Sequence, residues 1–184
     1  MIIGITGTDG SGKGTVVDYL KTKGFTHYSS RDFIVAEIES QGLEVTRNQM
    51  RLTANELRAK HGDDFVIRQA FEKAQKEGEK DVVIESVRAR AEANFLQQHG
   101  GILLAVDAEP EIRYARVQER RSASDQVSYE EFLAHEELEK NDPDPHGMQK
   151  EKVIQMADHT LTNNGTLPEL HMQIGAVLQK IEAK

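Results

Sequence analysis

Residues 2–15 read Ile2-Ile3-Gly4-Ile5-Thr6-Gly7-Thr8-Asp9-Gly10-Ser11-Gly12-Lys13-Gly14-Thr15. The apolar start predicts a buried strand, and the segment from residue 14 onward predicts a helix. The glycines between them let the backbone curl until successive N–H groups face one anion, and the start of the helix adds its dipole. The stretch therefore predicts a loop that holds a polyphosphate, with candidate contacts from Thr8, Asp9, Gly10, Ser11, Gly12, Lys13, Gly14 and Thr15.

The spacing of Gly7, Gly12 and Lys13 is that of a P-loop, with one difference. A strict P-loop has serine or threonine after the lysine, whereas this chain has Gly14 followed by Thr15. Thr15 is therefore the candidate hydroxyl for a magnesium ion, which we expect to rely more on water. The alternative, a glycine-rich turn with a surface lysine, fits the strand–loop–helix context less well.

Short β-branched runs alternate with longer amphipathic segments along the rest of the chain. The expected strands are residues 2–6, 25–28, 82–85, 102–107 and 159–162, and examples of the expected helices are 14–23, 30–40 and 110–121. This alternation predicts a three-layer α/β fold, with helices on both faces of a five-stranded parallel sheet. The first, third and fourth strands are nearly continuous apolar runs, as expected of strands buried on both faces.

Two stretches interrupt the alternation, and we interpret both as insertions over one end of the sheet. Residues 30–78 hold three consecutive helical segments. The middle one should begin at Thr46, because Thr46-Arg47-Asn48-Gln49 has the spacing of a capping box. Residues 122–147 are polar and acidic and end in turn-forming residues. No linker separates these parts, so we expect one domain over residues 1–184.

Composition excludes several classes of protein. The formal net charge of -8 and the pI of about 5.4 disfavour binding to nucleic acid or to anionic membranes. The absence of cysteine excludes disulfides and thiolate chemistry. The first residues lack the features of a signal peptide, and no apolar run approaches the ~20 residues of a membrane span. We therefore expect a cytoplasmic protein.

The loop, with glycine after its lysine, resembles that of adenylate kinases and related nucleoside monophosphate kinases. Three further segments are similar to theirs, namely Tyr28-Ser29-Ser30-Arg31-Asp32, Glu85-Ser86-Val87-Arg88 and Arg116-Val117-Gln118-Glu119-Arg120-Arg121. The resemblance implies a P-loop kinase fold in which residues 30–78 bind the acceptor and residues 122–147 form a short lid. It also implies that the arginines before the lid flank the nucleotide base.

The closest overall resemblance is to small adenylate-kinase-related proteins common in archaea. They share the stretch Asn55-Glu56-Leu57-Arg58 and the ending at residues 157–166. That ending is also similar to dephospho-coenzyme A kinases, in which an Asn-x-Gly turn lies against the adenine. This similarity implies that Asn164 contacts the nucleotide base and favours ATP over GTP.

Phosphoryl transfer needs cations and a carboxylate that holds magnesium more than it needs covalent chemistry. Glu85 ends the third predicted strand beside the loop, and we interpret it as a magnesium ligand, with a helix cap as the alternative. Arg88 is a candidate to grip the phosphate of the acceptor with its guanidinium fork. Its alternative role is an exposed position at the start of a helix.

Arg47, Arg51 and Arg58 fall within about 40° of one another on the predicted helix. Such a stripe over the active end of the sheet suits an anionic acceptor. A charged stripe is, however, also the usual solvent face of an amphipathic helix. Arg31 and Asp32 are acceptor-binding candidates of the same kind.

Arg113, Arg116 and Arg120 recur at helical spacing. We favour base stacking or phosphate contact for Arg116 and Arg120, against a solvent-facing stripe paired with glutamates. No arginine follows Arg121, although nucleoside monophosphate kinases carry lid arginines that clamp the transferred group. The charge for transfer should therefore come from Arg120, Arg121 or Lys150, unless turnover is slow.

These features predict an enzyme that uses ATP and Mg²⁺ to phosphorylate a small nucleotide acceptor, a nucleoside or deoxynucleoside monophosphate. One alternative is an enzyme like dephospho-coenzyme A kinase. The other is a slow P-loop NTPase that acts as a nucleotide-dependent switch on a protein partner. Lys13, Arg88 and Arg120 are the expected catalytic residues, and we expect a monomer or a homodimer with no membrane or nucleic-acid partner.

Overall fold

Five parallel strands form the sheet in the computed structural model, which describes residues 1–120, 127–140 and 142–183. They are β1 (Ile2–Gly7), β2 (Thr26–Ser29), β3 (Val82–Glu85), β4 (Ile102–Asp107) and β5 (His159–Thr162), and their spatial order is β2-β3-β1-β4-β5. β1, which leads into the glycine-rich loop, pairs with β3 on one side and β4 on the other. The expected five-stranded parallel sheet is confirmed, and its second strand begins one residue later than predicted.

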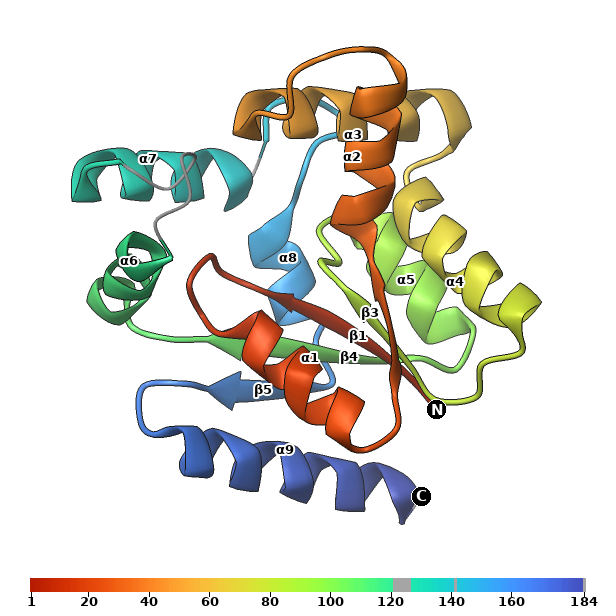
Figure 1. Ribbon diagram of the computed structural model, residues 1–184, viewed down its shortest axis with the longest axis vertical. Helices are drawn as coiled ribbons and strands as arrows, with labels where there is room; N and C mark the ends of the chain where they lie inside the picture. The colour runs from red at the N-terminus through yellow and green to blue at the C-terminus, as the bar shows by residue number, and fades with distance from the viewer. Residues whose placement is uncertain (121–126, 141, 184) are drawn as a thin grey trace.

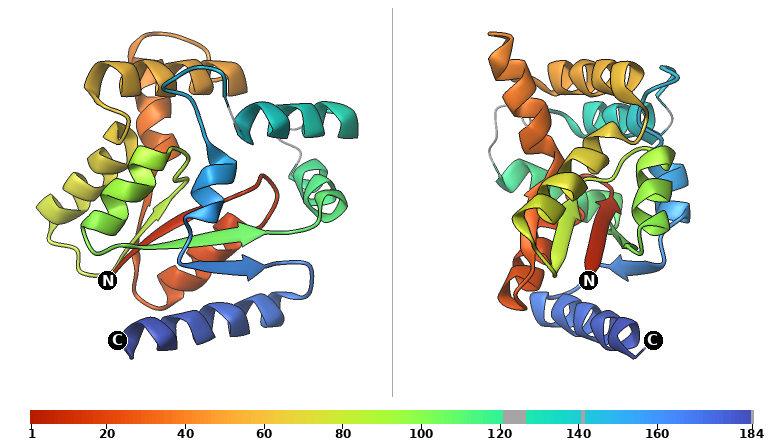
Figure 2. Two further views of the ribbon diagram at one scale, coloured as in Figure 1. Left: turned by 180° about the vertical axis from the view of Figure 1, so that it is seen from behind. Right: turned by 90° about the vertical axis from the view of Figure 1, so that its right-hand side faces the viewer.

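Helices cover both faces of this sheet (Figures 1 and 2). On one face lie α1 (Lys13–Thr22) and α9 (Leu167–Glu182), and on the other lie α4 (Phe65–Glu77), α5 (Arg90–Gln98) and α8 (Lys150–Gln155). The helices α2 (Ser30–Ser40), α3 (Arg47–His61), α6 (Pro110–Glu119) and α7 (Tyr129–Lys140) complete the described elements. None of the helices in these ranges is long and apolar enough to cross a membrane.

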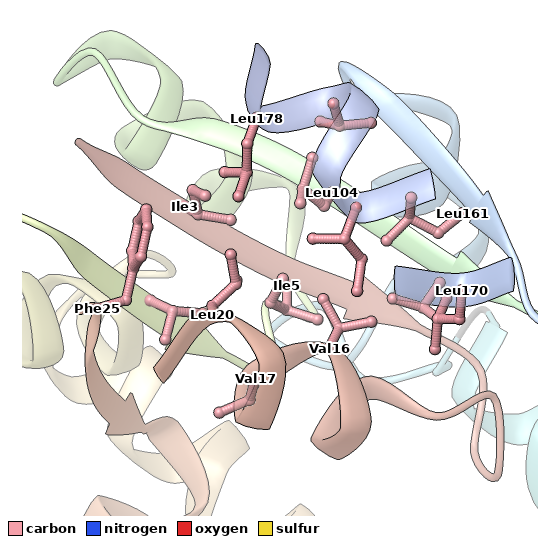
Figure 3. Close-up of a cluster of buried hydrophobic side chains, with 14 residues drawn as sticks. Ile3, Ile5, Val16, Val17, Leu20, Phe25, Leu104, Leu161, Leu170 and Leu178 are labelled. Carbon is pink, nitrogen blue, oxygen red and sulfur yellow. The ribbon is translucent and has the colours of Figure 1, made fainter. Parts of the chain in front are cut away.

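The two faces of the sheet bury separate apolar cores because successive side chains of a strand point to opposite sides. Ile5 and Leu104 lie in the core shared with Leu20 of α1 (Figure 3). Ile84 and Leu103 point the other way, into the core shared with α4, α5 and α8. Each fully buried side chain of this size stabilises the fold by about 1.5–3 kcal/mol. The strand that carries the loop is thus held firmly in the middle of both layers.

Three helices, α2, α3 and α4, lie between β2 and β3, as the sequence predicts. The hydroxyl oxygen of Thr46 accepts a hydrogen bond from the backbone N–H of Gln49 (3.1 Å), so α3 begins at the predicted cap. Arg47, the first residue of α3, follows this cap and contacts Asp9 of the glycine-rich loop.

Helix α7 was not expected from the polar composition of residues 122–147. It begins with a reciprocal pair of hydrogen bonds, from the Glu131 N–H to Ser128 Oγ (3.2 Å) and from the Ser128 N–H to the Glu131 carboxylate (2.7 Å). Ser128-Tyr129-Glu130-Glu131 is therefore a capping-box signal that the sequence analysis overlooked. Arg121, residues 122–126 of the expected lid and residue 141 lie outside the described residues, and α6 ends at Glu119.

Candidate phosphate-binding site

The glycine-rich loop joins the end of β1 to the start of α1, as predicted. Lys13 is the first residue of α1, and its ammonium group donates hydrogen bonds to the carbonyl oxygens of Gly7 (3.2 Å) and Thr8 (2.6 Å). Ser11 Oγ donates to the same carbonyl of Thr8 (2.8 Å). The loop therefore winds around the lysine that is expected to meet the phosphates.

Close contacts require glycine at two positions of the loop. At Gly10 (φ 76°) a Cβ atom would lie 2.3 Å from the carbonyl oxygen of Arg113, and at Gly12 (φ 99°) it would lie 2.3 Å from Nδ2 of Asn163. Both distances are far inside van der Waals contact, and the left-handed backbone adds strain for any other residue. Gly14 has no such neighbour within 4 Å, so a larger side chain would fit there.

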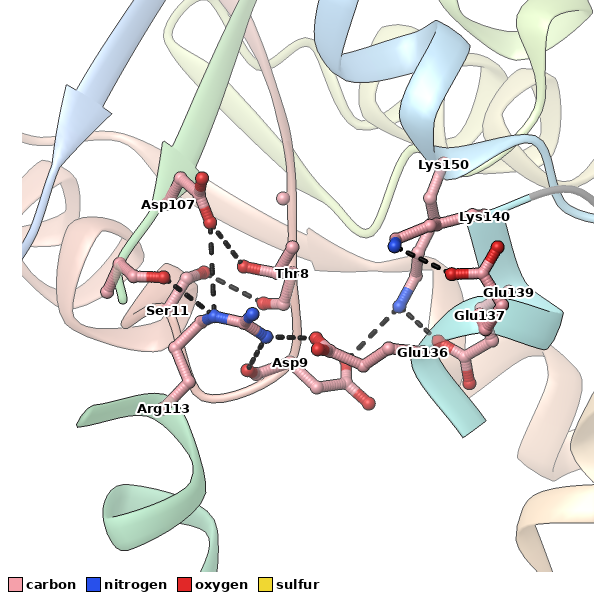
Figure 4. A network of polar contacts seen from close by, with 12 residues as sticks. Thr8, Asp9, Ser11, Asp107, Arg113, Glu136, Glu137, Glu139, Lys140 and Lys150 are labelled. Carbon is pink, nitrogen blue, oxygen red and sulfur yellow. Dashed lines mark hydrogen bonds and ion pairs between the residues drawn. The ribbon is translucent and has the colours of Figure 1, made fainter. Parts of the chain in front are cut away.

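Arg113 of α6 holds the loop from outside (Figure 4). Its side chain is buried, donates from Nη1 to the carbonyl oxygen of Asp9 (3.4 Å) and forms an ion pair with Glu136 of α7. Beside it, the Thr8 hydroxyl donates to the carboxylate of Asp107 at the end of β4 (2.8 Å). The loop is thus fixed by groups from two other segments of the chain.

The Asn163-Asn164-Gly165 turn after β5 also contacts the loop. Buried Asn163 donates from Nδ2 to the carbonyl oxygen of Ser11 (2.8 Å). Asn164, the predicted adenine contact, is exposed and accepts a hydrogen bond from the N–H of Glu109 before α6 (2.8 Å). The turn therefore joins the loop to the segment that leads into α6.

Asp9 of the loop lies within a group of charges that we call the charge cluster, formed by Asp9, Lys13, Arg47, Glu139 and Lys150. The Asp9 carboxylate is 2.6 Å from Arg47 Nη2, 3.3 Å from Lys150 Nζ and 3.9 Å from Lys13 Nζ. Glu139 of α7 pairs with Arg47 (2.8 Å) and with Lys150. The loop, α3, α7 and α8 therefore meet at one point, part of which is drawn in Figure 4.

The charges of this cluster shift one another's ionisation. Burial raises the pKa of Asp9, but the surrounding cations hold it well below its usual value. In order of effect, these cations are Lys150, Lys13, Arg88 and Arg47. Burial lowers the pKa of Lys13 to about 8, against the opposing effect of Asp9. These four cations face three carboxylates, Asp9, Glu85 and Glu139, so the site keeps one excess positive charge, which favours an anion.

The segment after β3 brings Arg88 to this cluster. Ser86 has a positive φ of 75°, and its N–H and that of Val87 both donate to the carbonyl oxygen of Ile5 (3.0 Å each). Glycine adopts such a left-handed backbone without strain, whereas serine does not. Arg88 lies close enough to the loop to lower the pKa of both Asp9 and Lys13.

Glu85, the predicted magnesium ligand, ends β3 beside the loop. The side chain of His27, whose Nε2 lies 3.2 Å from Glu85 Oε2, lowers the pKa of Glu85, so the carboxylate is ionised at neutral pH. Among the described residues no group of three or more acids or histidines could hold a metal ion. Mg²⁺ bound mainly by phosphates and water needs only one or two protein oxygens. The Glu85 carboxylate and the half-buried Thr15 hydroxyl are oxygens of the type that could serve, and their role as magnesium ligands stays a prediction.

The three arginines of the predicted α3 stripe form ion pairs with different partners. Arg47 joins the charge cluster, and Arg51 pairs with Asp142 beyond α7 (2.9 Å). Arg58 is only 2% exposed and pairs with buried Glu92 of α5 (2.8 Å). Arg58 is therefore surrounded by protein groups, and of the three arginines Arg47 is the one that pairs within the charge cluster.

The remaining predicted residues lie on α2 and at the end of α6. Arg31 and Asp32 are exposed in the first turn of α2. Arg120 is exposed at the end of α6, and one turn earlier Arg116 has a buried Nη1 without a hydrogen-bond partner. Arg113, to which we assigned no role from the sequence, is the residue of this helical stripe that is buried against the loop.

A cavity of about 400 Å³ lies apart from these charges, between α2, α3 and α4. Phe33, Leu57 and Phe65 are among its lining residues, together with polar groups such as Glu56 and Lys60. Its α3 residues occupy the opposite side of that helix from the arginine stripe. We place the candidate site at the loop and not at this cavity, because the loop amides and the cations of the charge cluster can bind an anion.

A glycine-rich loop at the end of the central strand of a parallel sheet defines a P-loop kinase-like protein. Residues 3–144 match a family model described as an AAA domain. The UPF0200 protein of Thermococcus kodakarensis is 30% identical over 190 residues, a match that spans 100% of both chains. The chain belongs to the UPF0200 family.

Solved structures share this fold. TT1252 from Thermus thermophilus is 26% identical with a TM-score of 0.64, and the match covers 98% of this chain and 97% of the other. Shikimate kinase from Bacteroides thetaiotaomicron is 12% identical with a TM-score of 0.63, covering 97% and 98%. Dephospho-CoA kinase from Campylobacter jejuni is 15% identical with a TM-score of 0.55, covering 98% and 96%. At such low identity the two kinases show a common fold and no more.

Proposed function

We propose that this protein is a cytoplasmic kinase that transfers a phosphoryl group from ATP, with Mg²⁺, to a nucleoside or deoxynucleoside monophosphate. The observation that carries the proposal is the charge cluster beside the P-loop. Arg47 and Lys150 reach the loop at Asp9 in addition to the loop's own Lys13. Phosphoryl transfer needs positive charge at the bound polyphosphate and at the group in transit to the acceptor, and these further cations add to the charge of Lys13.

On this proposal the loop amides and Lys13 bind the β- and γ-phosphates, and Arg116 and Asn164 lie against the base. Thr15 and Glu85 hold Mg²⁺ together with water. The acceptor is bound by residues from the inserted helices and from the segment after β3, with Arg88 on its phosphate. The remaining acceptor candidates are Arg31, Asp32, Arg47, Arg51 and Arg58, and Arg120 assists transfer from the end of α6.

Two alternatives remain as outcomes of the test. Dephospho-coenzyme A is another phosphate-bearing acceptor that such a cluster suits. A slow NTPase that switches a protein partner is favoured by the acidic residues of α7, which pair with cations of the site. It would hydrolyse ATP slowly whether or not an acceptor is present.

The test is a panel of nucleoside monophosphates, deoxynucleoside monophosphates and dephospho-coenzyme A, with ATP consumption and product formation followed for wild type and three variants. Lys13→Ala should lose ATP binding by tenfold or more. Arg88→Ala should keep ATP binding and raise the KM for the acceptor at least tenfold. Arg90→Ala is the matched control, because Arg90 is an exposed arginine of the same segment.

The results separate the three functions. A product formed from a monophosphate, with a KM that depends on Arg88, supports the proposal. If dephospho-coenzyme A is phosphorylated and no monophosphate is, the protein is a kinase with dephospho-coenzyme A as its acceptor. ATP consumption that no acceptor stimulates, and that Arg88→Ala leaves unchanged, would exclude a kinase and favour the switch.

A further inference from the structure

Arg47 and Lys150 converge on one carboxylate from two separate elements. Glu139 accepts from Arg47 Nη2 at one oxygen (2.8 Å) and from Lys150 Nζ at the other. Both cations also contact the carboxylate of Asp9 in the loop, at 2.6 and 3.3 Å. Two cations that each contact one oxygen of a carboxylate can contact two oxygens of a phosphate in the same way.

The position of this pair is next to the P-loop lysine. Lys150 and Lys13 approach the same oxygen of Asp9, at 3.3 and 3.9 Å. The two ammonium groups therefore flank one carboxylate oxygen. Lys150 is buried, with 7% of its side chain exposed, so its charge is weakly screened by water.

Lys150 and Glu139 are carried by differently anchored parts of the chain. Lys150 begins α8, whose Val153 is fully buried in the core beneath the sheet. The preceding residue, Gln149, donates its N–H to the carbonyl oxygen of Arg88 (2.9 Å), which ties Lys150 to the segment after β3. Glu139 belongs to α7, and its carboxylate forms ion pairs with Arg47 and Lys150. Lys150 thus stays beside the loop when this carboxylate leaves.

We propose that Arg47 and Lys150 form an anion subsite for the terminal phosphoryl group of the bound nucleoside triphosphate. Glu139 occupies this subsite in the structure and is displaced when the phosphoryl group binds. The inference rests on the proposed kinase function and extends it, since it names the source of positive charge in a chain that has no arginine after Arg121.

In the transfer step the bond between the terminal phosphorus and the oxygen that bridges it to the β-phosphate breaks. The nucleoside diphosphate keeps that oxygen and the bonding electron pair. A new bond forms between the phosphorus and an oxygen of the acceptor's phosphate, so no proton has to move. The two cations stabilise the charge on the remaining oxygens of the group in transit.

Calorimetry on the whole chain tests the subsite without requiring turnover. The magnesium complexes of ADP and of the β,γ-imido analogue of ATP are titrated into wild type and variants, and the ratio of the two affinities measures the contribution of the terminal phosphoryl group. Lys150→Met should reduce this ratio about tenfold, and Lys150→Arg should retain most of it. Glu139→Gln should raise it several-fold without changing the affinity for ADP, because the internal competitor loses its charge.

Matched controls come from the same helices. Lys152→Met changes an exposed lysine of α8, and Glu137→Gln changes an exposed glutamate of α7 that pairs with Lys140. Both controls should keep the wild-type ratio. If Lys150→Met does not fold, the double variant Lys150→Met/Glu139→Gln removes the charged pair together, and it should show a low ratio instead of the raised ratio of Glu139→Gln.

Each outcome decides the inference. A ratio that is equal in wild type, Lys150→Met and the double variant would overturn the subsite while leaving the kinase proposal intact. If Glu139→Gln leaves the ratio of the two affinities unchanged, the proposal that Glu139 is displaced by the phosphoryl group is wrong. If wild type binds neither nucleotide, the proposed function and the subsite fail together.

Discussion

Replacing Glu92 by alanine should severely destabilise the fold. Its carboxylate is completely buried in α5, where it contacts Arg58 Nε (2.9 Å) and Nη2 (2.8 Å). It also accepts hydrogen bonds from the backbone N–H groups of Arg88 (2.8 Å) and Ala89 (2.9 Å). The substitution therefore leaves a buried guanidinium without its counter-ion and two N–H groups at a helix start without their acceptor.

The magnitude follows from these contacts. Removing one partner of a buried ion pair costs about 3–5 kcal/mol, and losing the acceptor at a helix start costs about 1 kcal/mol. Glu92→Ala should therefore lower the free energy of unfolding by about 4–6 kcal/mol, a large part of the roughly 5–15 kcal/mol of a typical domain. Arg58→Met should cost less, about 3 kcal/mol, because Glu92 keeps its two backbone donors.

Urea unfolding followed by circular dichroism, with linear extrapolation to water, measures these differences. Glu39→Ala, at an exposed position of α2, is the control and should change the free energy of unfolding by less than about 0.5 kcal/mol. The reasoning is refuted if Glu92→Ala costs no more than this control, or if Arg58→Met costs more than Glu92→Ala. Either result would mean that the carboxylate's backbone contacts contribute little to the fold.

Three further predictions concern the loop and its neighbours. Because the pKa of Lys13 is lowered to about 8 from 10.5, the unfolded chain binds more protons between these values. The free energy of unfolding should therefore increase as the pH rises from 8 to 10.5, and this increase should be absent in Lys13→Met. Urea unfolding of both proteins at pH 7.5 and 9.5 measures it. An equal increase in both proteins would contradict the prediction. Gly14→Ala should raise the free energy of unfolding by about 0.5–1 kcal/mol, since Gly14 lies in α1 with open space around it; a lower melting temperature would show that the position requires glycine. Ser86→Gly should stabilise the fold by up to about 1 kcal/mol by relieving the left-handed backbone, and a loss of stability would argue against strain there.

The sequence predicted the fold well because its signals are local. The P-loop spacing, the apolar strands and the Thr46 cap each depend on residues a few positions apart, and the structure confirms the parallel sheet and the start of α3. The missed helix α7 had a local signal too, since Ser128 and Glu131 have capping-box spacing. Polar composition hid that signal by suggesting a loop.

The candidate site was less predictable because its contacts are long-range. Arg47 pairs with Glu139, 92 positions away, and no local pattern indicates that a charge on α3 meets one on α7. Arg58 illustrates the limit of helical periodicity, which placed it beside Arg47 and Arg51 but could not reveal the buried carboxylate of Glu92. Arg113 belonged to a recognised stripe, but its burial against Asp9 and its ion pair with Glu136 are long-range contacts that helical spacing does not indicate.

The hydrogen bond from Asn163 to the Ser11 carbonyl has a consequence for biosynthesis. These residues are 152 positions apart, so a ribosome makes the loop long before the asparagine that donates to it. β5 also has to pair with β4 to bring Asn163 into place. A nascent chain therefore carries a loop that lacks this hydrogen bond until Asn163 has been made and β5 has paired with β4.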